Sequence, residues 1–233
     1  MIGTVMSGFR RGSTRQWVQL MIGLCLYGIA ITLMLRSELG LGPWDMFHQG
    51  ISRLSGLPVG VASQLVGFVL LASLLLMGVR FGWGTISNIV LIGIVTDLTL
   101  PLVPEAPNPV WAYGYYAVAM VGCGLATGAY IGAQMGAGPR DSAMMILSRR
   151  WGWPVRRVRT AIELVVLLCG WLMGGKAGVG TLIFALSIGP AAQWGLRLFD
   201  AVPKPQSAPV PAAGAAEAKS NTGGHDVSVT ATR

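Results

Sequence analysis

The sequence predicts an all-helical membrane protein with six transmembrane helices, arranged as two inverted three-helix repeats. Each repeat carries a short Gly-x-Gly-Pro-x-Asp helix after its first span. Three observations predict this fold class. The 233-residue chain is 53% hydrophobic and only 11% charged, whereas soluble domains carry about 25% charged residues. Six apolar runs each approach the roughly 20 residues that cross a bilayer, and the second half of the chain resembles the first.

The first apolar run, residues 17–35, follows a basic segment that could also begin a cleaved signal sequence. The run is longer than the apolar part of a typical signal sequence, and no small-x-small cleavage site follows it. We therefore expect a retained first helix. The other five apolar runs are 59–78, 86–103, 110–131, 158–174 and 179–199.

The expected organisation has four parts. Residues 1–16 form a cytoplasmic segment, 17–103 the first three-helix repeat, and 110–199 the second. Four prolines between positions 101 and 109 separate the repeats. The tail, 203–233, is rich in Ala, Pro, Gly and Ser and lacks apolar periodicity, which predicts a disordered cytoplasmic segment.

Lys and Arg residues divide unequally between the two sides of this arrangement. All but three of the 17 lie on the side of both termini, and the exceptions are Arg36, Arg53 and Lys176. Because cytoplasmic loops are enriched in Lys and Arg, we expect both termini in the cytoplasm and the protein in the bacterial cytoplasmic (inner) membrane. This topology accounts for the net charge of +8. No basic groove with interleaved aromatic residues is visible, so nucleic acid is not an expected partner.

A shift of 96 positions aligns the two halves without a gap. The phrase "LGLGPWD" (39–45) then falls on "MGAGPRD" (135–141). Matches of Gly, Pro and Asp are more informative than matches of Leu between two apolar segments. Because each unit has three spans, the second unit must enter the membrane from the opposite side, as in many secondary transporters.

The repeated motif predicts the start of a helix. Proline suits the first turn, where its missing N–H is not needed, and an Asp two residues later favours the positive end of the helix dipole. We expect short helices from Pro43 to about Leu54 and from Pro139 to about Arg150. Two interpretations stay open: an interfacial helix that Asp merely stabilises, or a half-helix that lines a polar site within the membrane.

Other polar residues could join such a site. Asp97 and Gln193 match each other late in the third and sixth spans, so Asp97 could approach Asp45 and His48, and Gln193 could approach Asp141. Alternatively, Asp97 could be exposed at the membrane–water interface. The candidate substrate or ion site therefore comprises Gly40, Gly42, Pro43, Asp45, His48, Asp97, Gly136, Gly138, Pro139, Asp141 and Gln193.

Two further patterns have structural interpretations. Gly124, Gly128 and Gly132 recur at every fourth position, which is typical of close packing between membrane helices. Glu163 follows Arg159 by four residues, which favours an ion pair within one helix. A basic loop, which would set the topology or bind a partner, contains Arg140, Arg149, Arg150, Arg156, Arg157 and Arg159.

The two motifs, "LGLGPWDMFHQGIS" above all, resemble those of the bacterial YczE/YitT-type integral membrane proteins. The resemblance extends over about residues 17–195. It implies a polytopic inner-membrane protein and supplies no substrate. In the second motif Arg140 replaces Trp44, so the two copies are not chemically equivalent.

These features favour a small secondary transporter or permease for an unidentified solute or ion. The alternative is a non-transporting membrane regulator that binds a partner through the basic loop. An enzyme is not expected, because no Ser/His pair, HExxH motif or phosphate loop is present. The three cysteines have neither C-x-x-C spacing nor nearby histidines, so neither a metal nor a cofactor is expected. Besides the lipid bilayer, a second copy of the chain is a candidate partner, because six helices are few to enclose a path.

Overall fold

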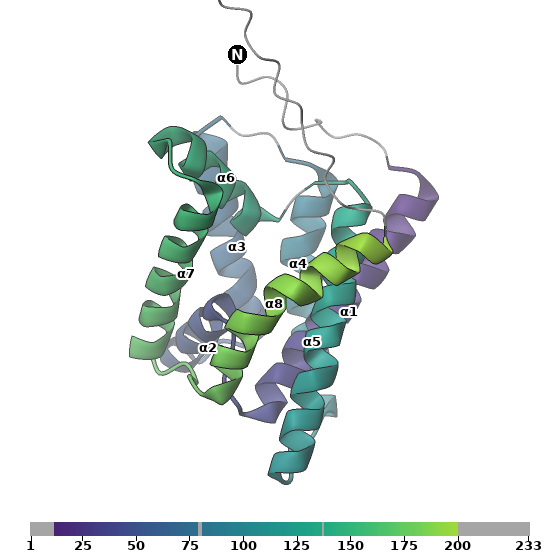
Figure 1. The fold of residues 1–233 in the computed structure, drawn as a ribbon, viewed down its shortest axis with the longest axis vertical. Helices are drawn as coiled ribbons and strands as arrows, with labels where there is room; N and C mark the ends of the chain where they lie inside the picture. Colours follow the sequence, from purple (N-terminus) through teal and green to yellow (C-terminus); the bar gives the residue numbers. More distant parts are fainter. Residues whose placement is uncertain (1–11, 79–80, 137, 200–233) are drawn as a thin grey trace, which may run out of the picture. The chain divides into compact units, whose positions relative to one another are not determined.

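The computed structural model describes residues 12–78, 81–136 and 138–199, and every regular element in these ranges is helical (Figure 1). The six apolar runs form α1 (Thr14–Ser37), α3 (Val59–Leu76), α4 (Trp83–Thr99), α5 (Pro109–Gly132), α7 (Val155–Leu172) and α8 (Val179–Leu198). The two motifs begin α2 (Pro43–Ser55) and α6 (Pro139–Trp151), and a short 3-10 helix, Leu100–Leu102, follows α4. The predicted tail, 203–233, and residues 1–11 lie outside the described residues.

Five helices are long and apolar enough to cross a membrane, namely α1, α3, α4 with its 3-10 extension, α5 and α8. The predicted helical membrane protein is confirmed at this level. The sequence predicted six spans, but α7 does not meet the same measure of apolarity. Its 18 residues include Arg156, Arg157, Arg159 and Glu163, which lower its hydropathy.

The 96-residue repeat recurs in the backbone. Helices α2 and α6 have the same length and start 96 positions apart, and the same holds for α3 and α7. The left-handed residues match as well, since φ is 115° at Gly40 and 130° at Gly136, and 56° at Glu38 and 55° at Gln134. A glycine is needed at positions 40 and 136, because side chains rarely tolerate these φ values.

The short helices also end in the same way. Ser52 donates a hydrogen bond to the carbonyl oxygen of Leu57 over 2.6 Å, and Ser148 donates one to that of Trp153 over 2.6 Å. A left-handed glycine, Gly56 or Gly152, terminates each helix. Local sequence signals therefore set both ends of α2 and α6.

The two halves pack through reciprocal contacts. Helix α1 packs against α4 and α5, and α5 packs against α8, while α2 and α6 each lie between α3 and α7. The Gly84 N–H donates to the Met135 carbonyl over 3.0 Å, and the Gly180 N–H donates to the Leu39 carbonyl over 2.7 Å. A shift of 96 positions converts each of these bonds into the other. The segment before each motif is thus held by a helix of the other half.

Helices α1 and α5 form the centre of the core. Leu20 and Leu24 of α1 are fully buried, as is Ala119 of α5. Gly124 lies against Ala191 of α8, and Gly128 lies against Gly195 of the same helix. These two glycines allow the backbones of α5 and α8 to approach closely.

We predict that Gly128→Ala destabilises the protein by about 1 to 2 kcal/mol, because the added methyl group would overlap the Gly195 carbonyl. The measurement is thermal unfolding of the purified protein in detergent, followed by tryptophan fluorescence. Gly114→Ala on the same helix is the control, since nothing lies within 4 Å of the added atom. Equal unfolding temperatures for the two variants would contradict this packing.

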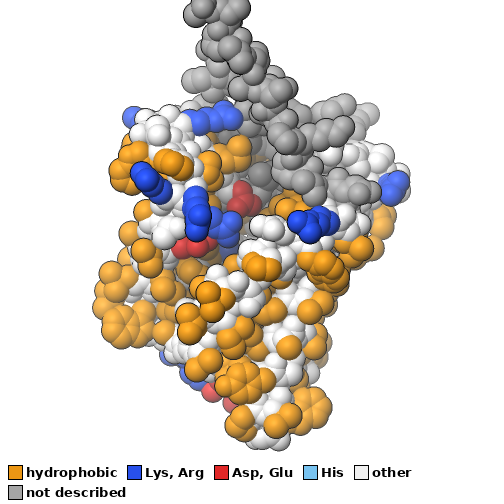
Figure 2. Space-filling view, in the orientation of Figure 1, with side chains coloured by type: hydrophobic (Ala, Val, Ile, Leu, Met, Phe, Trp, Pro, Cys, Tyr) orange, Lys and Arg blue, Asp and Glu red, His pale blue; other side chains and the backbone are white. Residues whose placement is uncertain are grey.

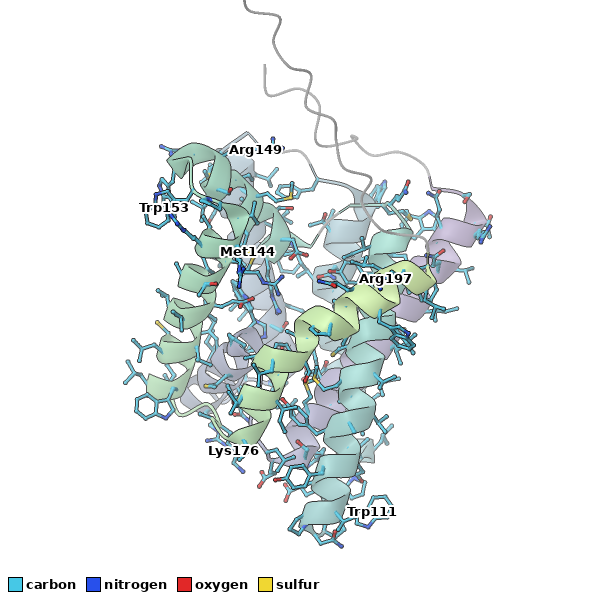
Figure 3. The ribbon with its side chains drawn as sticks, in the orientation of Figure 1. Trp111, Met144, Arg149, Trp153, Lys176 and Arg197 are labelled. Atoms are coloured by element: carbon cyan, nitrogen blue, oxygen red, sulfur yellow. The ribbon has the colours of Figure 1, made fainter. Side chains whose placement is uncertain are left out.

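Charged and aromatic residues mark the two ends of the helical bundle. Figure 3 shows Arg149 and Trp153 at one end, and Lys176 and Trp111 at the other. Helix α6 lies toward the Arg149 end and α2 toward the Lys176 end (Figures 1 and 3). We call these the Arg149 end and the Lys176 end.

Candidate functional site

A cavity of about 370 Å³ lies where the first turns of α2 and α6 meet the long helices. All eight α-helices contribute to its wall, and the two motifs supply Gly42, Pro43, Trp44 and Asp45, and Gly138, Pro139, Arg140 and Asp141. The volume falls within the range of small-molecule sites. The structure therefore places both motifs at one cavity.

The position that differs between the two motifs forms a direct contact across the cavity. Trp44 and Arg140 are equivalent in the repeat, and the Arg140 guanidinium lies over the Trp44 ring, 4.9 Å from its centroid. Such a contact between a cation and an aromatic ring is attractive. The Arg140 Nη2 atom also lies 3.3 Å from the His48 Nε2 atom. A residue that the sequence assigned to the basic loop thus lies in the cavity wall.

His48 lies near both Arg140 and Asp45. A guanidinium has no acceptor, so the His48 Nε2 atom accepts this hydrogen bond and the ring proton is on Nδ1. The Nδ1 atom lies 3.8 Å from the Asp45 Oδ1 atom, which is beyond hydrogen-bonding distance. Both side chains are buried. Among the described residues, none donates a hydrogen bond to this Asp45 oxygen.

Asp141, the equivalent of Asp45, has a weak partner. The Tyr130 hydroxyl donates to the Asp141 Oδ2 atom over 3.4 Å, which is long for an O–H donor. Next to Asp141, the buried Ser142 hydroxyl has no hydrogen-bond partner within the described ranges. Each motif therefore brings to the cavity an acidic side chain with few donors around it.

The surroundings change the protonation of these groups, which lie in α2 and α6, outside the five apolar spans. Burial raises the pKa of the Asp45 carboxyl, and Arg140 opposes this effect. Burial also raises the pKa of the Asp141 carboxyl, against the effects of Arg159 and Arg140. Burial and then Arg140 lower the pKa of the His48 imidazole well below its ordinary value, so this ring is neutral at neutral pH.

An ion pair of α7 also borders the cavity. Arg159 and Glu163 are 2.8 Å apart, which confirms the predicted pair within one helix, and both line the cavity. Gln193 of α8 and Asp141 also line the cavity, and the expected approach of these two residues stays a prediction.

The cavity opens between α7 and α8. Figure 2 shows the surface hollowed there, with acidic and basic side chains inside the hollow. Within the described ranges, α7 and α8 lack the packed interface that joins α3 to α4. Gly93 of α4 packs against the Gly60 carbonyl, whereas nothing lies within 4 Å of a Cβ built on the equivalent Gly189.

Asp97 does not approach Asp45 and His48, contrary to the sequence-based expectation. Its Oδ1 atom accepts a hydrogen bond from the Gly60 N–H over 2.7 Å, and its Oδ2 atom accepts one from the Val61 N–H over 3.0 Å. These are the first free N–H groups of α3, which the helix itself cannot satisfy. Asp97 therefore caps α3 from α4 and lies outside the set of cavity-lining residues.

The other predicted residues lie outside the cavity wall, where Gly40 and Gly136 contact the opposite half of the chain. Gly40 lies against Gly178, and Gly136 lies against Thr85. Gly132 forms the end of α5. Of the basic loop, Arg149, Arg150, Arg156 and Arg157 are exposed, and Arg159 is half-exposed. Tyr27 and Tyr130 also line the cavity and were not expected there. An aromatic residue in an apolar run gives no signal that distinguishes a cavity-lining side chain from a packed one.

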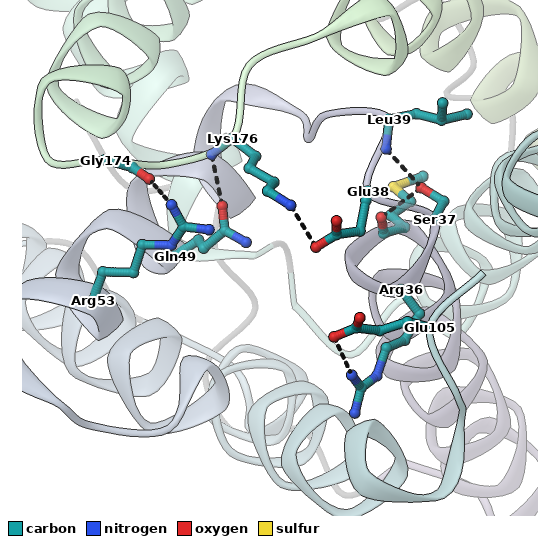
Figure 4. Close-up of polar contacts among 10 residues, drawn as sticks. Arg36, Ser37, Glu38, Leu39, Gln49, Arg53, Glu105, Gly174 and Lys176 are labelled. Carbon is teal, nitrogen blue, oxygen red and sulfur yellow. Dashed lines mark hydrogen bonds and ion pairs between the residues drawn. The ribbon is translucent and has the colours of Figure 1, made fainter. Parts of the chain in front are cut away.

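Several polar contacts lie at the Lys176 end, most of them between the two halves (Figure 4). The Lys176 Nζ atom lies 2.5 Å from Glu38 Oε1, and the Lys176 N–H donates to the Gln49 side chain over 2.7 Å. Arg53 donates to the Gly174 carbonyl, and Arg36 pairs with Glu105 over 3.2 Å. The three cations that the sequence placed apart from the others thus all have partners at this end.

These features define a helical membrane protein of two similar halves around a cavity that carries charges of both signs. The chain belongs to a family of unknown function (DUF6198), whose model matches residues 14–197. It is 33% identical to the uncharacterised membrane protein YczE of Bacillus subtilis over 178 residues, which are 75% of this chain and 82% of the relative. The YczE-type resemblance is thereby confirmed.

Two further relatives share most of their length with the chain. An uncharacterised protein of Haemophilus influenzae is 32% identical over 187 residues, covering 79% of this chain and 84% of the relative. The uncharacterised protein YyaS of Bacillus subtilis is 24% identical over 176 residues, covering 70% and 83%. No solved structure matches the chain significantly.

Proposed function

We propose that this protein is a small secondary transporter or permease of the bacterial inner membrane, and not an enzyme, with its substrate site in the cavity between α2 and α6. The observation that carries this proposal is the meeting of two equivalent Gly-x-Gly-Pro-x-Asp turns at one cavity. Paired interruptions in the two halves of a membrane protein point to a transport site.

The proposal treats α7 as the sixth span and the two halves as inverted repeats. Reciprocal hydrogen bonds between the halves support it, because a two-fold relation exchanges equivalent atoms in this way. The exposed arginines at the α6–α7 connection support cytoplasmic termini. The charged residues of α7 are compatible with a span, since Arg159 and Glu163 face the cavity and pair with each other.

A second function has one observation in its favour. Arg149, Arg150, Arg156 and Arg157 are exposed together at the Arg149 end, where they could bind an acidic partner protein. In this alternative the protein is a regulator without transport activity. Arg140 lines the cavity and does not belong to that surface, while Arg159 is half-exposed and pairs with Glu163 at the cavity.

The test compares deletion cells that express the wild type, Asp45→Asn, Asp141→Asn, or a variant with the four exposed arginines changed to glutamine. Metabolite profiles of cells and medium are measured, and any solute that changes is followed in proteoliposomes containing the purified protein. We expect both Asp variants to match the deletion, because each removes a cavity charge, and the arginine variant to match the wild type. The opposite pattern would support the regulator, and Asp variants with wild-type profiles would refute the site.

A further inference from the structure

The charges that line the cavity do not balance. Five charged side chains contribute to its wall, and Arg159 is paired with Glu163 over 2.8 Å. This leaves the carboxyl groups of Asp45 and Asp141 with one guanidinium, that of Arg140. A cation between these two carboxyl groups would favour their ionised forms, which together exceed the cavity's own cations by one charge.

The two carboxyl groups also have few hydrogen-bond donors around them. Asp45 is more than nine-tenths buried, and its Oδ1 atom accepts no hydrogen bond from the described residues. Asp141 receives a long bond from Tyr130. Because a buried carboxylate oxygen without a donor is costly, a ligand that donates hydrogen bonds to Asp45 and Asp141 would be favoured here.

The aromatic residues show how a cation is held here. The Arg140 guanidinium lies over the Trp44 ring, and Tyr27 and Tyr130 lie edge to face with each other in the same wall. Rings of this kind attract organic cations, and they offer little to an inorganic ion that needs several oxygen ligands. No group of three or more His, Cys, Asp or Glu residues that could hold a metal ion occurs in the described part of the chain.

We propose that the cavity binds a small organic monocation of the guanidinium or alkylammonium class, with Asp45 and Asp141 as its counter-charges and Trp44, Tyr27 and Tyr130 around it. The proposal rests on the cavity being the substrate site of the proposed transporter. A monocation supplies the missing positive charge and the missing donors together. The volume of about 370 Å³ suits a small molecule.

The test is calorimetric binding to the full-length protein in detergent, with N-ethylguanidinium chloride as the probe. N-ethylurea is the neutral analogue of the same shape, sodium chloride is the inorganic control, and sodium butyrate tests an anion. We expect N-ethylguanidinium to bind, and the other three not to. Binding of butyrate alone, or equal binding of N-ethylurea, would overturn the proposal.

Variants locate the site. Asp45→Asn and Asp141→Asn should each weaken N-ethylguanidinium binding at least tenfold, whereas Glu105→Gln, an exposed carboxylate outside the cavity, should leave it unchanged. Size-exclusion chromatography and circular dichroism check the fold of each variant. Should one Asp variant fail to fold, the other decides, and unchanged affinity in a folded Asp variant would overturn the assignment.

This experiment separates the ligand from the transport function. Binding of N-ethylguanidinium without flux in proteoliposomes would keep the site and reject the transporter. Flux of a neutral or anionic solute that depends on Asp45, without binding of the cation, would keep the transporter and reject the monocation.

Discussion

Replacement of Asp97 by alanine is expected to lower the free energy of unfolding by about 3 kcal/mol. The carboxylate accepts two hydrogen bonds from the first N–H groups of α3, and a bond to a charged group contributes roughly 1.5 to 3 kcal/mol. The cap also joins α3 to α4, at the place where Gly60 and Gly93 lie in contact. Its removal therefore loosens both the helix end and the interface.

The measurement is thermal or denaturant unfolding of the purified protein, with Asp97→Asn and Glu105→Gln alongside. Asparagine keeps one acceptor, so its loss should be intermediate, while Glu105 is exposed and should have little effect. An unfolding temperature of Asp97→Ala equal to that of the wild type would show that the cap contributes nothing.

Exchange of Trp44 and Arg140 gives the second large effect. Arg140→Trp is expected to destabilise the protein by about 2 kcal/mol, since it removes the cation from the Trp44 ring and the hydrogen bond to His48. Trp44→Arg should cost about as much, because two guanidinium groups would then be adjacent. Because the two positions are equivalent in the repeat, the double variant Trp44→Arg/Arg140→Trp should recover part of the loss.

A double-mutant cycle on unfolding free energies measures this coupling. Arg149→Gln is the matched control, because Arg149 lies on the same helix and is exposed. Additive effects of the two single substitutions would mean that the Trp44–Arg140 contact has no energetic consequence.

Local signals made the motif helices predictable. Proline at the start, Asp in the first turn and glycine after the end each act within a few residues, so α2 and α6 begin at Pro43 and Pro139 as predicted. The shared cavity was one of two interpretations that the motif left open, because signals within a few residues do not show what a helix N-terminus faces. The sixth expected span, α7, is less apolar than the other five, because charged residues occupy its first half.

Contacts between distant helices were not predictable in this way. The partner of Asp97 is the backbone of α3, and no pattern of residue types marks a free N–H group in another helix. Arg140 was grouped with the loop arginines because positive charge is a topology signal in membrane proteins. The repeat aligns Arg140 with Trp44, but this match alone does not show that the two side chains are in contact. The contact is visible only in the structure.

The cap of α3 by Asp97 makes the two halves of the chain non-interchangeable. The equivalents of Gly60 and Asp97 in the second half are Arg156 and Gln193, which supply neither the close approach nor the carboxylate. A tandem of two first halves would therefore carry this cap on both flanks, and a tandem of two second halves would carry none. The difference at these two positions therefore separates the α3–α4 flank, where the helices are in contact, from the α7–α8 flank, where the surface is hollowed (Figure 2).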